Sequence, residues 1–175
     1  MEYTAHYNSP LGRIILTGDG DALTGLRFED PAADRPVPDS IRNEKATAAF
    51  EETMRWLDLY FGGRDPGFTP KMNLRGTAFR RTVWEILLTV PYGTTVTYGE
   101  IAARAAGWLN LPRTSARAVG GAAGHNPILL IIPCHRVIGA DGSLTGYAGG
   151  VHRKAWLLDM EKAPAGGNCP PRGDP

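Results

Sequence analysis

The chain has 175 residues, of which 42% are hydrophobic, and 19 Lys and Arg against 18 Asp and Glu leave a formal net charge of +1. This length suits one large domain or two small ones, and the sequence lacks the run of about 18 apolar residues that a membrane-spanning helix requires. The first residues show no basic segment followed by an apolar stretch, and the chain has only 2 cysteines, so we expect no secretion signal and a reducing, cytoplasmic location.

The beginning of the chain is predicted to form three short strands, over residues 3–7, 13–17 and 22–28, because strand-forming residues alternate with turns rich in Gly, Asn and Asp. One of these turns reads Gly-Asp-Gly-Asp from Gly18 to Asp21. It superficially suggests a calcium loop, but it lacks the further carboxylates and the distal Glu, so we interpret it as a hairpin turn.

A helix is predicted next, capped by Asn43 and ended by two glycines that follow Phe61. Residues 63–75 show no periodicity and are predicted to link two units. The expected core face of the helix follows helical spacing and consists of Phe50, Met54, Leu57 and Phe61.

The second half opens with a helix that Thr77 caps and that carries an apolar stripe as far as Val90. A short strand-like segment, residues 94–96, follows it. Thr97 and Glu100 then form a capping box, in which the threonine hydroxyl and the glutamate carboxylate each satisfy a free backbone N–H. This box predicts the start of another helix.

That helix is predicted to end at Gly107, and a connector over residues 108–112 leads to a further short helix that begins at Thr114 or Ser115. Two short helices joined in this way fit a helix-turn-helix. The second helix consists mostly of Ala and Gly with one arginine, so it offers almost no side chains to read base edges. It suits either close approach to a nucleic-acid backbone or minor groove, or tight packing between helices.

The stretch with the strongest indication of reactivity contains Cys134 and His135. It follows the apolar run 128–132, which is predicted to be a strand. A cysteine beside a base can become a thiolate nucleophile, although a buried, space-filling cysteine is the more common case. Adjacent residues on a strand point to opposite faces, so we expect a water or a turn to connect Cys134 and His135. Glu161 is a candidate for holding the imidazole in a Cys–His–Glu relay, although His135 could equally be a core histidine and Glu161 an exposed carboxylate.

A glycine-rich loop, residues 146–150, follows the cysteine. It lacks the Lys-Ser/Thr of a phosphate-binding loop, so we expect it to let a flat ligand lie close to the backbone. A last helix is predicted over residues 151–162, and the residues expected to pack inward are Val151, Ala155, Trp156 and Leu158.

Charge supports a division into two domains and a tail. Residues 1–72 carry 8 Lys and Arg against 12 Asp and Glu, a net of −4, whereas residues 73–163 carry 10 against 5, a net of +5. We predict an N-terminal support domain and a C-terminal domain whose basic charge would suit a polyanion. Residues 164–175, which include Cys169, are predicted to be a disordered tail.

Several motifs of the second domain resemble those of a known family. The run Pro133-Cys134-His135-Arg136-Val137, with Asn126-Pro127 before it and Gly146-Tyr147-Ala148-Gly149-Gly150 after it, resembles the O6-alkylguanine-DNA alkyltransferases, or methylated-DNA–protein-cysteine methyltransferases. The resemblance extends from Arg75 to Glu161. It implies an α+β fold, with a small ribonuclease H-like N-terminal domain of antiparallel strands plus a helix. A mostly helical domain would follow, with a helix-turn-helix and a short strand that carries the active-site cysteine.

The resemblance also implies the catalytic roles. Cys134 would accept the alkyl group, His135 would remove its proton through a water, and Glu161 would orient the histidine. Asn126 would organise the turn around the cysteine, and Tyr98 would crowd the phosphate and hydrogen-bond the flipped base.

The same resemblance implies a DNA-binding surface and a base pocket. Arg117 would enter the duplex in place of the flipped base. The other implied DNA contacts are Tyr98, Thr97, Ala116, Gly120, Gly121 and Arg136, and the implied walls of the base pocket are Val137, Tyr147, Ala148, Gly149 and Gly150.

The activity implied is single-turnover repair of double-stranded DNA, in which the alkyl group of O6-alkylguanine moves irreversibly to the cysteine after base flipping. O4-methylthymine is a further substrate to test. We expect a monomer with no membrane partner, no cofactor and no metal, because the zinc-site cysteines of some members are absent. The alternatives are an alkyltransferase-like protein that binds lesions without transfer, and a cysteine hydrolase.

Two positions depart from the family pattern. The connector over residues 108–112 is longer than in familiar members, which leaves the spacing of the two helices on DNA open. Ala148 stands where some members carry a serine that bonds the base, so backbone N–H groups would have to replace that contact.

Overall fold

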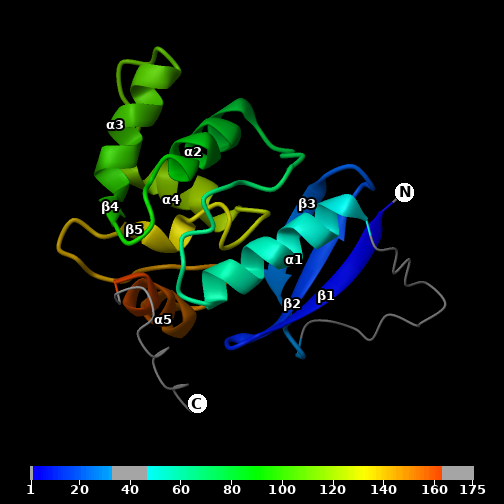
Figure 1. Cartoon of the computed structure of the whole chain (residues 1–175). Helices are drawn as coiled ribbons and strands as arrows, with labels where there is room; N and C mark the ends of the chain where they lie inside the picture. Colours follow the sequence, from blue (N-terminus) through cyan, green and yellow to red (C-terminus); the bar gives the residue numbers. More distant parts are fainter. Residues whose placement is uncertain (1, 33–46, 163–175) are drawn as a thin grey trace. The chain divides into compact units, whose positions relative to one another are not determined.

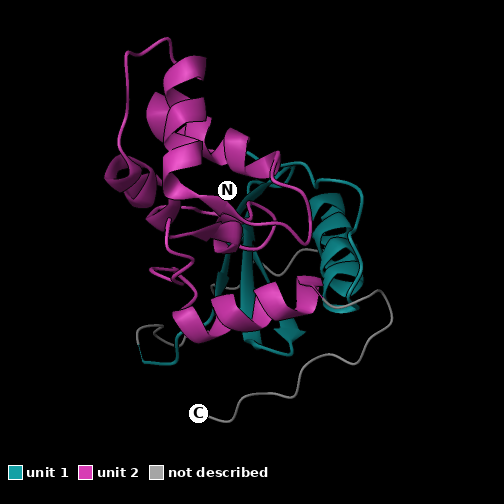
Figure 2. Cartoon of the chain, turned by 90° about the vertical axis from the view of Figure 1, so that its left-hand side faces the viewer, with its two compact units in different colours: residues 1–73, 171–175 teal, residues 74–170 magenta. Residues whose placement is uncertain are grey.

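The computed structural model describes residues 2–32 and 47–162, and it divides the chain into two compact units with the boundary between Asn73 and Leu74 (Figure 1, Figure 2). The first unit is a sheet with one helix and the second is mostly helical, which confirms the predicted α+β class. Asn43 and the predicted tail with Cys169 lie outside the described residues. In the described ranges, no helix has the length and apolar character needed to cross a membrane.

The first unit contains the three predicted strands. Strands β1 (Tyr3–Ser9), β2 (Gly12–Gly18) and β3 (Leu23–Phe28) form an antiparallel sheet in that order. The turn between β2 and β3 is closed by Asp19, whose carboxylate accepts the backbone N–H groups of Asp21 and Ala22. The acidic turn therefore serves the hairpin, as the sequence predicts.

Helix α1 (Ala48–Phe61) packs against all three strands of this sheet. It begins later than predicted, because the side chain of Thr47 accepts the Phe50 N–H at 3.3 Å and so caps the helix. The core face is also rotated from the prediction. Phe50 and Leu57 are buried as expected, whereas Met54 and Phe61 are half-buried and the aromatic rings of Trp56 and Tyr60 are buried instead.

The segment predicted as a linker belongs in part to the first unit. Leu23 donates its N–H to the Lys71 carbonyl at 2.9 Å, and Asn73 donates to the Leu23 carbonyl at 2.8 Å. Met72 thereby forms a parallel bridge with Leu23. The chain runs along the edge of β3 before it enters the second unit.

Three mutually packed helices form much of the second unit: α2 (Ala78–Leu88), α3 (Tyr98–Trp108) and α4 (Ala116–Gly124). Their predicted N-caps are confirmed, because Thr77, Thr97 and Ser115 each accept a backbone N–H from the first turn. The indole of Trp84 ties α2 to α4 by donating to the Ala122 carbonyl at 2.9 Å.

Helix α3 does not end at Gly107 as predicted. It continues to Trp108, and the reversal occurs at Asn110, whose φ is 53°. The Leu111 N–H returns to the Ala106 carbonyl at 2.8 Å, which is the bond of a left-handed helix terminus. Asn tolerates this conformation better than most residues other than Gly, so the asparagine is the stop signal.

The predicted strand over residues 128–132 is wrong. The segment is a buried series of turns in which Leu130 has a φ of 70°, and Ile132 donates its N–H back to the Ile128 carbonyl at 3.1 Å. Cys134 therefore follows a turn and lies in a 3-10 helix (Cys134–Arg136), immediately before the short strand β5 rather than within it.

Strand β5 (Val137–Ile138) pairs in parallel with β4 (Val96–Thr97), which begins later than the predicted segment 94–96. The last helix, α5 (Val151–Lys162), has the predicted bounds. Its Trp156 and Leu158 are buried as predicted, but Val151 is 46% exposed. One buried face of α5 instead carries the charged residues Lys154 and Glu161.

Candidate functional site

A cavity of about 330 Å³ opens beside the cysteine in the second unit. Its lining comes from the start of α3, the second half of α4, the 3-10 helix and the loop before α5. The residues that line it are Tyr98, Gly120, Ala123, Gly124, Cys134, Thr145, Gly146, Tyr147 and Ala148. Five of the nine are Gly or Ala, so the cavity is bordered by backbone over much of its lining and by the rings of Tyr98 and Tyr147 elsewhere.

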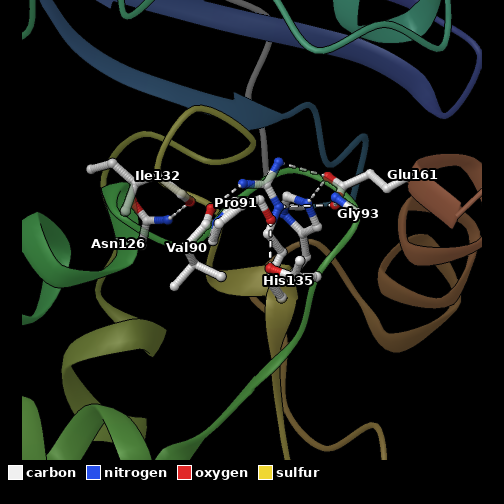
Figure 3. Close-up of polar contacts among 9 residues, drawn as sticks. Val90, Pro91, Gly93, Asn126, Ile132, His135 and Glu161 are labelled. Atoms are coloured by element: carbon white, nitrogen blue, oxygen red, sulfur yellow. Dashed lines mark hydrogen bonds and ion pairs between the residues drawn. The ribbon is translucent and has the colours of Figure 1, made fainter. Parts of the chain in front are cut away.

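Cys134 is 5% exposed and its sulfur is held by Asn126. The Asn126 amide donates to the Cys134 Sγ at 3.1 Å and to the Ile132 carbonyl at 2.8 Å, while its oxygen accepts the Ile128 N–H at 2.9 Å. Figure 3 shows the bond from Asn126 to Ile132. One buried amide thus fixes both the turn and the sulfur, because all its hydrogen-bonding groups are used.

His135 is fully buried and bonded to the glutamate that the sequence singled out. Its Nε2 lies 2.7 Å from Glu161 Oε1, and neither side chain is exposed (Figure 3). The carboxylate accepts the Nε2 proton, and in a neutral imidazole this leaves the lone pair on Nδ1. Cys134 and His135 are neighbours on a 3-10 helix, which has three residues per turn, so their side chains diverge by about 120°.

Arg136 is not available to DNA, contrary to the implied contact. It is 7% exposed, its Nε and Nη2 donate to the two oxygens of Glu161 at 2.9 and 3.0 Å, and its Nη1 donates to the Val90 carbonyl at 2.7 Å. Gly93 completes the cluster, because its N–H donates to Glu161 Oε2 at 3.3 Å. A side chain at Gly93 is excluded by its φ of 76° and by a Cβ position 3.1 Å from the Glu161 carbonyl.

Burial sets the proton affinities of these groups. It raises the pKa of the Cys134 thiol to about 11, against opposing effects of the Asn126 hydrogen bond and the Lys154 charge. It lowers the pKa of His135, although the bond to Glu161 acts the other way. For Glu161 burial would raise the pKa, but the bonds from His135 and Arg136 outweigh it and hold the pKa at about 2. At neutral pH the resting site is therefore a thiol, a neutral imidazole and a carboxylate.

The start of α3 and the surface of α4 hold the implied DNA contacts. Tyr98 is half-buried and donates its hydroxyl to the Thr145 carbonyl at 2.9 Å. The Thr97 hydroxyl caps α3 and also donates to Glu100 Oε2 at 2.9 Å. On α4, Ala116, Arg117 and Gly121 are exposed, whereas Gly120 is half-buried against the Tyr98 ring.

Three of the implied pocket walls do not line the cavity. The Val137 side chain is fully buried, because β5 directs it into the core beside β4. Gly149 is buried and Gly150 has a φ of 91° at the junction with α5, so the two glycines shape the turn instead. Among residues 2–32 and 47–162, no group of three or more His, Cys, Asp and Glu lies together as a metal site would require.

Sequence reasoning assigned no role to several parts of the site, although Lys154 is among the positions that carry the family resemblance. Ala123 and Gly124, the last two residues of α4, line the cavity. Lys154 is fully buried beside the cavity and donates to the Thr145 carbonyl at 3.1 Å. Its position seven residues before Glu161 is a signal that was present, because residues two helical turns apart share one face.

Comparison with known proteins gives a consistent result for both units. Residues 78–163 match the family model described as "6-O-methylguanine DNA methyltransferase, DNA binding domain", and residues 3–74 match its ribonuclease-like domain. A Mycobacterium bovis protein named methylated-DNA–protein-cysteine methyltransferase is 46% identical over 167 residues, which cover 91% of this chain and 94% of the relative.

Two solved structures from Mycobacterium tuberculosis are similar over nearly the whole chain. The crystal structure of its O6-methylguanine methyltransferase has a TM-score of 0.75 and 44% identity, and covers 94% of this chain and 96% of its own. The structure of the same organism's protein in complex with DNA has a TM-score of 0.73 and 44% identity, and covers 92% of each chain.

Proposed function

Because the chain belongs to the 6-O-methylguanine DNA methyltransferase family, we propose that it repairs DNA by moving the alkyl group of O6-alkylguanine irreversibly to Cys134, once per molecule. The observation that carries this proposal is the position of Cys134, whose sulfur accepts a hydrogen bond from Asn126 and lines a cavity next to the buried His135–Glu161 pair.

The chemistry is a nucleophilic displacement at the alkyl carbon. The Cys134 thiolate attacks in line, a carbon–sulfur bond forms, the carbon–O6 bond breaks, and its electron pair leaves with the guanine, which takes up a proton. The product is a neutral thioether. No group of the site can reverse this bond, so each molecule acts once.

The proton of the thiol has a defined route in this proposal. With a pKa near 11, Cys134 is protonated at neutral pH and needs a base. His135 is neutral there and accepts the proton through a water, while the ionised Glu161 stabilises the imidazolium that forms. Glu161 thus acts as the orienting group and Asn126 as the group that positions the sulfur.

Access to the alkyl group requires base flipping, because the O6 position of a stacked guanine is out of reach of the thiolate. The exposed Arg117 near the start of α4 enters the duplex in place of the base. Small residues along α4 allow the backbone to approach the minor groove closely. The Tyr98 hydroxyl then exchanges its bond to the Thr145 carbonyl for a bond to the flipped base.

The two domains have different tasks. Every residue that lines the cavity falls within residues 73–163, so we assign binding and transfer to this domain and a supporting role to residues 1–72. The site is assembled from one chain, which fits a monomer. A reducing cytoplasm suits the reaction, because the thiol must remain free until the lesion arrives.

The test is incubation with a duplex oligonucleotide that carries O6-methylguanine, followed by intact-protein mass spectrometry. We expect one methyl group in place of one hydrogen, located on Cys134 and absent from the Cys134→Ala variant. A parallel reaction with O4-methylthymine measures the breadth of the substrate range. An unmodified duplex is the control.

The alternatives give different results in the same experiment. A lesion-binding protein without transfer would retard the modified duplex in a gel while its mass stays unchanged. A hydrolase would turn over repeatedly and leave no lasting adduct. Either result would overturn the proposal.

A further inference from the structure

Lys154 is a fully buried lysine in the first turn of α5. Its Nζ donates to the carbonyls of Thr145 and Gly146 at 3.1 and 3.4 Å, and lies 5.9 Å from the centre of the Tyr98 ring. Thr145, Gly146 and Tyr98 all line the cavity beside Cys134. The ammonium therefore lies directly behind the wall of the site.

The charge of this lysine has no carboxylate counterpart in the part of the chain that the structure describes. Glu161, two turns further along α5, is engaged by His135 and Arg136. A buried ammonium without a counter-charge is unfavourable, and a neutral donor could hold two carbonyls equally well. The positive charge itself therefore needs an explanation.

The group on which that charge acts is Cys134. The Lys154 ammonium lowers the pKa of the thiol, against the effect of burial. Burial lowers the pKa of Lys154 itself, and the charge of a Cys134 thiolate opposes that effect. Before transfer the sulfur must become an anion, and after transfer it is a neutral thioether. In the resting protein, Lys154 has no anionic partner among the described residues. The reaction creates one, the Cys134 thiolate.

The other ionisable groups described around the sulfur do not serve as the counter-cation of the Cys134 thiolate. Burial raises the pKa of Tyr98 and of Tyr147, so both phenols are neutral at pH 7. The charges of Glu161 and Arg136 offset each other, and His135 is neutral in the resting site. Arg153, the neighbour of Lys154 in sequence, donates its guanidinium to the Gly149 carbonyl at 2.9 Å.

We propose that Lys154 is a positioning residue for alkyl transfer, whose ammonium holds the Thr145 and Gly146 carbonyls in the cavity wall and is the counter-cation of the Cys134 thiolate during attack. This role rests on the proposed function. It adds an electrostatic partner for the sulfur to the proton route through His135 and Glu161. Helix α5 supplies both, because Lys154 and Glu161 share one of its faces.

The test distinguishes the effect of the Lys154 charge from the effect of its hydrogen bonds. Its first measurement uses no DNA. In a Cys169→Ser background, the alkylation of Cys134 by iodoacetamide is followed by mass spectrometry as a function of pH. Lys154→Met removes the charge and the hydrogen bonds, whereas Lys154→Gln removes the charge and keeps a donor. The matched control is Lys162→Met, at the exposed end of the same helix.

We expect both neutral variants to move the pH profile of Cys134 alkylation upward by about one unit, which lowers the rate at neutral pH about tenfold. Lys154→Arg should keep the profile near that of the wild type, and Lys162→Met should leave it unchanged. The same tenfold loss is expected for transfer from free O6-benzylguanine, with recovery as the pH rises. Affinity for duplex DNA should not change, because a fully buried lysine cannot reach a phosphate.

A folded Lys154→Gln protein with the wild-type pH profile would overturn the proposal, and this variant carries the test if Lys154→Met does not fold. Failure of the proposed function gives a different pattern. In that case the wild type would show no transfer from any alkylguanine, while the iodoacetamide profile would still report on the charge of Lys154.

Discussion

At the scale of single residues, Glu161 accepts more hydrogen bonds than any other described side chain of the site. Its two oxygens accept from His135, from two nitrogens of Arg136 and from the backbone of Gly93. The side chain is not exposed, so these donors take the place of water around the carboxylate. The residue that is proposed to orient His135 is therefore also the counter-charge of the buried Arg136.

Glu161→Gln should destabilise the protein by about 3 kcal/mol at pH 7, because the buried Arg136 charge would lose its partner. Since the folded pKa of Glu161, about 2, lies below its ordinary value of 4.5, the wild type gains stability from it above about pH 4.5 and loses that gain as the pH falls toward 2. Urea unfolding at pH 7, 5 and 3 measures both effects.

The control for this prediction is Asp159→Asn, which changes an exposed carboxylate on the same helix. It should leave the free energy of unfolding nearly unchanged at each pH. Equal losses for the two variants, or an acid dependence in Glu161→Gln as large as that of the wild type, would contradict the assignment.

Sequence reasoning assigned Cys134, His135, Glu161 and Asn126 to one site, and the structure brings them together. It did not foresee that Arg136 is buried. The first four belong to local motifs or to a family pattern that can be matched by eye. An arginine is usually exposed, and nothing near Arg136 in sequence announces that its partner is Glu161, 25 residues away. Burial of a charge is decided by such distant pairs, which a single sequence does not display.

At the scale of elements, the helices could be predicted where a capping residue marks their start. The capping residues of α2, α3 and α4 act within four residues, so their effect can be read locally. The segment 128–132 carries no such signal. Its residues are all apolar and buried, so no alternation distinguishes a strand from a turn, and the left-handed Leu130 is held by the surrounding core.

Thr97→Ala should reduce the free energy of unfolding by about 1 kcal/mol, because it removes one half of the capping box at the start of α3. Urea denaturation measures the loss, and Thr95→Ala, an exposed threonine just before β4, is the control. If the two variants unfold at the same urea concentration, the box does not stabilise the helix.

At the scale of the whole molecule, charge is distributed unevenly, with −4 on residues 1–72 and +5 on residues 73–163. The family match of the second unit carries the description of a DNA-binding domain, which agrees with this asymmetry. The modest excess of positive charge suits a protein that holds DNA through a few phosphate contacts and little base reading.

Arg117→Ala should slow repair of O6-methylguanine in duplex DNA while reaction with free O6-benzylguanine stays near the wild-type rate, because the arginine is proposed to enter the duplex and does not line the cavity beside Cys134. If Arg117 also contacts phosphate, the slope of log affinity against log salt should become less steep by roughly 1. Arg64→Ala, an exposed arginine of the first unit, is the matched control. Equal losses on duplex and free base would make Arg117 a structural residue.

The left-handed turn at Asn110 has a consequence for how this protein can vary. It ends α3 within the connector itself, and the cavity draws on Tyr98 at the opposite end of α3 and on residues 120–124 at the far end of α4. Added length between residues 110 and 115 costs little, since loop closure grows only by about 0.6 kcal/mol per doubling. The exposed Leu111 lies in this stretch and the exposed Trp108 just before it. The stretch is thus a region where new sequence can be accepted, by evolution or by an inserted label, while the alkyl-accepting chemistry is left intact.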